Sequence, residues 1–205
     1  MALIHRASIR PTKAELLADW VPTQPWGEQE LELVGAYRFD DPAGEVGIET
    51  HVLSTPEGHL LQVPLTYRGA PLDGADEFLI CTMEHSVLGR RWIYDAIVDP
   101  VYARVLASVL LAGGSQAEEI VDGADAPREP SVRVTGGAPR SRVVPLIDHV
   151  RASSDGSASV MEMSGALRIV VCRRLDRRAT PTDRDSTLTG TWSGLDSPIL
   201  LAYVT

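Results

Sequence analysis

The sequence predicts an α+β fold in which a curved antiparallel β-sheet is covered by two helices and followed by a smaller β element near the C-terminus. Two observations predict the sheet and its helices. Between residues 28 and 94, short runs with an apolar period of two alternate with turn sequences, which is typical of an antiparallel meander. Two stretches, after Thr12 and after Asp99, carry helix-start signals and apolar residues at helical spacing.

The helix after Asp99 has the clearest signals. Asp99 is a suitable N-cap, because its carboxylate can accept from the unpaired N–H groups of the first turn, and Pro100 suits the first helical position. Apolar residues recur every four positions from Val101, and Gly113 supplies the stop. The stretch 92–100, which leads into this helix, therefore connects the predicted sheet to its main helix.

The earlier helix begins after Thr12, which forms a capping box with Glu15, and it ends at Pro22. The sheet strands are expected at residues 28–39, 46–53, 59–67, 78–87 and 92–94, after a short first strand at 3–7. Pro64 within the third of these sheet strands predicts an edge or a bulge, because proline cannot donate to the ladder.

After the second helix, the acidic and proline-containing stretch 115–130 is the best domain boundary. We expect residues 1–114 to form one domain and residues 115–205 to pack against it. The second part should contain a short strand at 131–135, a strand or short helix at 143–150, and hairpins at 158–172 and 187–204. The charged run 173–184 is expected to be an exposed linker.

Composition excludes some functions. The net charge of −9 over 205 residues argues against a nucleic-acid binder, which normally presents a basic face. No apolar run is long enough for a membrane helix and the start lacks a signal peptide, so we expect a cytoplasmic protein that does not contact membranes. Cys81 and Cys172 lie in apolar runs and are expected to be buried, reduced thiols.

Several segments, in the same order, resemble the N-terminal cap domain of actinobacterial maltokinases, which are kinase-like sugar kinases. The stretch W-V-P-T-Q-P-W at 20–26 is similar to the opening motif of that family, L-Q-V-P-L at 61–65 to one of its strands, and Y-D-A-I-V-D-P at 94–100 to the motif before its helix. Residues 157–160 and 167–175 resemble the hairpin that begins the kinase lobe. The resemblance implies a cap-like domain over residues 1–114 and the start of a kinase N-lobe after it.

The sequence departs from the family's catalytic pattern. The lysine that would hold ATP phosphates aligns with Val170, and no catalytic-loop or metal-binding motif of a kinase is present. The chain is also expected to end about where a kinase needs its C-terminal lobe. We therefore predict no catalytic residues, no cofactor and no metal.

The candidate ligand or partner surface consists of large aromatic and basic side chains: Trp20, Trp26, Trp92, Arg173 and Arg174. The alternatives are core packing for the tryptophans and a solvated linker for the arginines. Glu49 and His51 could meet Glu84 and His85 across a sheet and form a metal site, but exposed strand positions explain these residues better. Asp95 and Asp99 could act as acid and base, but a polar strand-to-helix corner for Asp95 and a helix cap for Asp99 explain them better.

The function predicted from this resemblance is that of a non-catalytic interaction or regulatory module, whose partner is a sugar kinase or an enzyme of glycogen or trehalose metabolism. One alternative is a protein that binds a sugar or phosphosugar through the tryptophans. The other is a divergent sugar kinase subunit that is completed by another chain.

Overall fold

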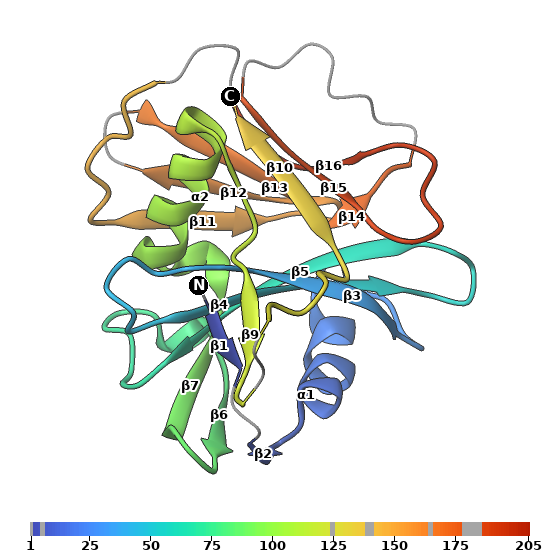
Figure 1. Ribbon diagram of the computed structural model, residues 1–205. Helices are drawn as coiled ribbons and strands as arrows, with labels where there is room; N and C mark the ends of the chain where they lie inside the picture. Colours follow the sequence, from blue (N-terminus) through green and yellow to red (C-terminus); the bar gives the residue numbers. More distant parts are fainter. Residues whose placement is uncertain (1, 5–6, 124–125, 138–141, 164–165, 178–185) are drawn as a thin grey trace.

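The computed structural model describes residues 2–4, 7–123, 126–137, 142–163, 166–177 and 186–205. Within these residues the strands form two seven-stranded sheets and one two-stranded ribbon. Figure 1 shows one sheet above the other, with the earlier part of the chain in the lower sheet and the later part in the upper one. Over the described residues the chain is therefore mostly β, with two α-helices.

The lower sheet is the antiparallel meander that the sequence predicts. It is curled, and its strand order is β2 (Ile9–Arg10), β6 (Leu79–His85), β7 (Gly89–Asp95), β5 (Leu60–Arg68), β4 (Gly47–Ser54) and β3 (Glu32–Phe39), with β14 (Arg174–Leu175) added beside β5. The strand β3 forms one edge of this sheet.

The upper sheet corrects the expectation of a smaller C-terminal element, because it has as many strands as the lower one. Its order is β11 (Val150–Ser154), β12 (Ala158–Met163), β13 (Arg168–Cys172), β16 (Ile199–Val204), β15 (Thr187–Thr191), β10 (Arg133–Gly137) and β8 (Gly114–Ser115). Both predicted hairpins are confirmed, although the turn expected at 164–165 lies outside the described residues. The pairing of β8 and β10 is harder to predict because an acidic loop separates them in sequence.

Two segments outside the large sheets also differ from the prediction. In the stretch 143–150, which was expected to be a strand or a short helix, residues 143–149 have no regular structure and Val150 begins β11. The first strand, β1 (Ala2–Ile4), pairs in parallel with β9 (Glu119–Val121), apart from both large sheets. The acidic stretch after residue 115 therefore contributes a short strand.

The two helices do not cover the same face of one sheet, contrary to prediction. The helix α1 (Lys13–Trp20) and the 3₁₀ turn η1 (Val21–Thr23) cover one face of the lower sheet, where Leu16 and Leu17 join a core cluster with residues of β5 and β7. The helix α2 (Pro100–Ala112) packs beside β10 of the upper sheet, and its buried residues join the larger core cluster, to which both sheets contribute.

Both helix starts follow the sequence prediction. Thr12 and Glu15 form the expected capping box at α1. At α2, Asp99 Oδ1 accepts from the Val101 N–H at 2.9 Å and Pro100 occupies the first turn. Two further 3₁₀ turns are η2 (Asp76–Phe78) and η3 (Ala96–Val98), the latter leading directly from β7 into α2. No helix in the described part of the chain has the length and apolar content needed to cross a bilayer.

Pro64 lies in a central strand and not at an edge, which corrects another prediction. The Gln62 N–H donates to the Arg173 carbonyl on the side where β14 lies. On that same side β5 changes partner, from β14 at Leu60–Leu61 to β7 at 65–68. Pro64 falls in the gap between the two partners, so its missing N–H costs no ladder hydrogen bond.

Cys81 and Cys172 each carry a thiol that is not in a disulfide, and both are only partly buried, which corrects the expectation of full burial. Cys81 lies in β6 of the lower sheet and Cys172 in β13 of the upper sheet. Partial burial raises the pKa of the Cys81 thiol, which keeps it protonated at neutral pH.

The contact between α2 and β10 depends on a glycine. A Cβ atom added at Gly136 would lie 2.3 Å from Val109 Cγ1 and 2.8 Å from the Val109 carbonyl oxygen. We expect Gly136→Ala to lower the free energy of unfolding by about 1–3 kcal/mol, the usual cost of overpacking, measured by urea denaturation. Gly156→Ala is the control, because the nearest atom to its added Cβ would be the Pro25 carbonyl oxygen at 3.7 Å. Equal stabilities of the two variants would contradict this packing.

Candidate functional site

Four of the five predicted site residues lie together. The rings of Trp20 and Trp26 meet edge to face with centroids 5.7 Å apart, and the Arg173 guanidinium lies 4.5 Å from the centre of the Trp26 ring. Arg174 Nε donates to the Trp26 carbonyl oxygen at 3.2 Å. The fifth residue, Trp92, lies on β7 and packs against the larger core cluster instead.

Arg173 joins the two sheets from a fully buried position. Its Nη2 atom donates to both carboxylate oxygens of Asp95 at 2.6 Å, and its Nε atom donates to Ser159 Oγ at 2.6 Å. Asp95 ends β7 of the lower sheet, whereas Ser159 lies in β12 of the upper sheet. The expectation of an exposed linker at 173–184 is therefore wrong at its first residue, because this arginine is a core residue held by a buried carboxylate, and residues 178–184 lie outside the described residues.

Burial divides the predicted site residues into two groups. Trp26 and Arg173 have no exposed area, so in this structure they belong to the core and present nothing to a ligand. Trp20 and Trp92 are half-buried, and the Arg174 side chain is 41% exposed. A ligand or partner surface stays a prediction for these three residues.

A second buried polar cluster lies on the lower sheet around Glu49 and His51. Both residues were expected at exposed strand positions, but Glu49 is 6% exposed and His51 is 2% exposed. Glu49 pairs with Lys13 from α1 at 2.5 Å and with Arg38 Nε from β3 at 3.4 Å. His51 Nε2 lies 3.5 Å from the Glu49 carboxylate and 3.4 Å from the Tyr67 hydroxyl.

Burial and charge act in opposite directions in this cluster. Burial alone would raise the pKa of the Glu49 carboxyl, but the positive charges of Arg38 and Lys13, and of His51 when it is protonated, hold that pKa well below its usual range. Burial lowers the pKa of His51 to about 4, although Glu49 partly opposes this effect. His51 is therefore neutral at pH 7. No group of three possible metal-binding side chains occurs among the described residues.

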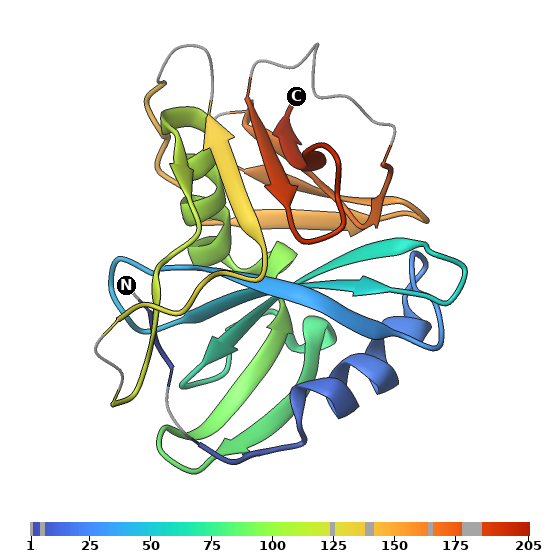
Figure 2. The same cartoon turned by 45° about the vertical axis from the view of Figure 1, so that its right-hand side comes forward.

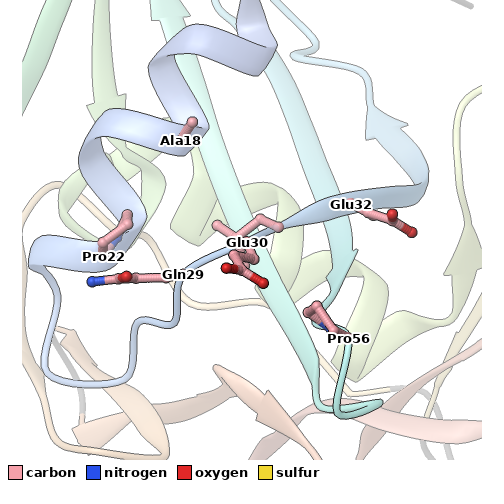
Figure 3. Close-up of a pocket in the computed structure, with 7 residues that line it drawn as sticks. Ala18, Pro22, Gln29, Glu30, Glu32 and Pro56 are labelled. Atoms are coloured by element: carbon pink, nitrogen blue, oxygen red, sulfur yellow. The ribbon is translucent and has the colours of Figure 1, made fainter.

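An open groove lies between α1 and the beginning of β3, next to the segment 20–26. We call it the β3 groove. It has a volume of about 720 Å³ and is lined by Ala18, Pro22, Gln29, Glu30, Leu31, Glu32 and Pro56. Figure 3 shows Ala18 and Pro22 on the helix side and Pro56 on the opposite side, with the Glu30 carboxylate between Gln29 and Pro56.

The β3 groove is acidic. Glu28, just before it, is neutralised, because its carboxylate lies 2.6 Å from Arg174 Nη2 and 3.4 Å from His59 Nδ1. In contrast, neither Glu30 nor Glu32 forms an ion pair within the described part of the chain. Glu30 also has a positive φ of 54°, which is uncommon for a residue other than glycine. Two exposed carboxylates therefore alternate with Leu31 and Leu33 along the chain.

A second cavity of about 520 Å³ lies where the loop 72–78, the start of α2 and β11 meet. Its lining mixes both signs of charge, with Asp73, Glu77, Asp148 and Arg151. Close to the start of the same helix, Arg68 Nη1 donates to both oxygens of Asp99 at 2.9 and 2.8 Å. Asp99 is thus a helix cap and an ion-pair partner, and Asp95 holds Arg173, so both carboxylates have structural partners.

No sequence pattern pointed directly to the β3 groove or to the Arg173 and Glu49 clusters. The only usable signs were the unusual alternation E-L-E-L at 30–33 and the isolated Asp95 before the second helix. Val170, which aligns with the kinase lysine, lies in β13 and is 7% exposed, so it packs in the upper sheet.

The comparisons with known proteins extend over different parts of the chain. Residues 20–99 match the model of the maltokinase N-terminal cap domain, so the predicted resemblance is confirmed over this segment. A solved structure of a glucosamine kinase in complex with glucosamine, ADP and inorganic phosphate is 18% identical, with a TM-score of 0.46 over 95% of this chain. The present chain spans 40% of the length of that kinase chain. No curated protein matches the sequence.

Proposed function

We propose, starting from the maltokinase N-terminal cap domain that residues 20–99 match, that this protein is a non-catalytic, kinase-related cap module. It acts by binding another protein, and the partner class is a sugar kinase or an enzyme of glycogen or trehalose metabolism. The match covers a domain that precedes the kinase lobe in its family, which supports the proposal that the module serves a kinase or a related enzyme.

The observation that carries the proposal is that the side chains best suited to chemistry are buried and paired with one another. Arg173 and Asp95 form an ion pair in the core, and Asp99 pairs with Arg68 while it caps α2. A catalytic acid, base or phosphate-binding cation must contact its substrate. Because these groups face protein atoms, their arrangement supports a structural role, and the exposed features are left for contact with a partner.

The position that the family resemblance assigns to the phosphate-binding lysine supports the same proposal. Val170 pairs with Val160 and Tyr203 in the middle of the upper sheet. An apolar side chain there contributes to the sheet core and supplies no positive charge for ATP phosphates.

A sugar-binding function is the second candidate, and the size of the β3 groove favours it. Its volume of about 720 Å³ falls within the range of small-molecule sites. Trp20, at the C-terminal end of α1, is half-buried and belongs to the segment 20–26 next to the groove, although its side chain is not among those that line it.

The test uses the purified chain with ATP and either maltose or glucosamine, alone and with native cytosolic extract. We expect no phosphorylated sugar from the chain alone. Affinity capture from the same extract should retain an enzyme of sugar metabolism, which binds again after separate purification. Formation of phosphorylated sugar by the chain alone would contradict the proposal, and retention of a sugar without any protein would favour the second candidate.

A further inference from the structure

The edge strand of the lower sheet is covered over only part of its length. Ser131 Oγ bonds both the N–H and the carbonyl of Ala36, and the Ala117 N–H donates to the Arg38 carbonyl. These contacts cover the end of β3 that is closer to Phe39. Figure 2 shows the segment that leads into β10 crossing β3 there, whereas the end near α1 has no further strand beside it in the described part of the chain.

The uncovered end of β3 continues directly into the β3 groove. Leu33, in this part of the strand, is 63% exposed, which is high for a leucine in a sheet. Glu32, which directly precedes Leu33, and Glu30, two residues before Glu32, both have exposed side chains. Leu31 between them packs against the core cluster that α1 covers. An open backbone edge, an exposed leucine and two carboxylates that have no ion-pair partner among the described residues thus lie together.

From this arrangement we infer that the uncovered end of β3, with the β3 groove, is the docking surface for an extended segment of a partner protein in which basic and apolar side chains alternate. The backbone of that segment adds a strand to the sheet edge. Its lysines or arginines meet Glu30 and Glu32, and its apolar side chains contact Leu33. This inference rests on the proposed function, because it names the surface through which the module binds its partner.

Charge selects this occupant over a second copy of the chain. Two copies paired edge to edge would bring the same carboxylates, Glu30 and Glu32, close to one another, and like charges that face each other are destabilising. The net charge of −9 also repels a second copy and attracts a basic segment. Carboxylates on an edge strand can also serve only to prevent aggregation, and the experiment must separate that role from docking.

The probe is a fluorescein-labelled dodecapeptide of alternating lysine and valine, with the corresponding glutamate–valine peptide for comparison. Binding to the full chain is measured by fluorescence anisotropy. We expect the lysine peptide to bind and the glutamate peptide not to bind. The variant Glu30→Lys/Glu32→Lys should weaken binding of the lysine peptide by about tenfold or more, which corresponds to a loss of about 1.4 kcal/mol or more in binding free energy. A lysine peptide with alternate backbone nitrogens methylated should also lose binding, because it cannot form the edge hydrogen bonds.

The matched control is Glu45→Lys/Glu118→Lys, which changes the net charge equally at two exposed positions away from the groove. It should keep most of the binding. Equal weakening by both double variants, or full binding of the methylated peptide, would show a general electrostatic attraction and overturn the inference. No binding of the lysine peptide would assign the carboxylates to edge protection alone. A partner captured equally well by Glu30→Lys/Glu32→Lys would overturn this surface while leaving the proposed function intact.

Discussion

Replacing Asp95 with Asn should lower the free energy of unfolding by about 3–5 kcal/mol, measured by urea denaturation. The reason is that Arg173, which is fully buried, would keep its charge without a carboxylate partner. Arg173 also donates a hydrogen bond to Ser159 of the upper sheet. The loss of stability should therefore affect the packing between the two sheets and not only a local turn. A loss below about 1 kcal/mol would contradict this account of the buried pair.

The double variant Asp95→Asn/Arg173→Met provides the control for that prediction. Removing both charges leaves no unpaired buried ion, so its stability loss should be smaller than the sum of the losses in the two single variants. A purely additive result would mean that Asp95 and Arg173 contribute independently. The exposed ion pair of Arg90 and Glu84 provides a comparison at the surface. Removing one partner of this pair should lower the free energy of unfolding by less than about 1 kcal/mol.

Acidification should destabilise the protein through His51. The pKa of His51 is about 4 in the folded chain and 6.5 is its ordinary value, so the unfolded state binds the proton first as pH falls. The contribution of neutral His51 to the free energy of unfolding is therefore complete above about pH 6.5 and is lost progressively as the pH falls towards 4. The difference of about 2.5 pKa units corresponds to about 3 kcal/mol over that window. Urea midpoints between pH 7.5 and pH 5 measure the onset of this loss.

The variant His51→Gln should remove most of this pH dependence, because the side chain no longer titrates. His59→Gln is the control, since the His59 side chain is 56% exposed. Protonation of Glu49, whose pKa is held low, destabilises the protein only below its ordinary value of 4.5, so it does not obscure the range from pH 7.5 to pH 5. A slope that survives in His51→Gln would assign the effect to other groups.

Local signals predicted the helices and most strands well. The capping box at Thr12 and the cap at Asp99 depend on residues within one turn of each other, so sequence alone specifies them. The meander from β3 to β7 follows from short turns between neighbouring strands. The order of the upper sheet depends on pairings between distant segments, such as β10 with β15, and no local pattern reports them.

The main error of the sequence-based prediction was to place buried charged residues at the surface. The reason for this error is physical. Arg173 opens a charged run, and such runs are usually solvated, so only its tertiary partners Asp95 and Trp26 explain its burial. Glu49 and His51 alternate with apolar residues as exposed strand positions do, but Lys13 and Arg38 approach them from α1 and β3. The β3 groove forms between α1 and β3, which are brought together only in the folded chain.

The most direct test of the central claim, that this is a non-catalytic cap module acting through protein contact, is the stoichiometry of its complex with a partner captured from native cytosol. The purified chain and the separately purified partner are mixed and analysed by light scattering and isothermal titration calorimetry. We predict a defined complex of the two proteins that forms without ATP or sugar. Saturable sugar phosphorylation by the isolated chain, with no complex in solution, would contradict the claim.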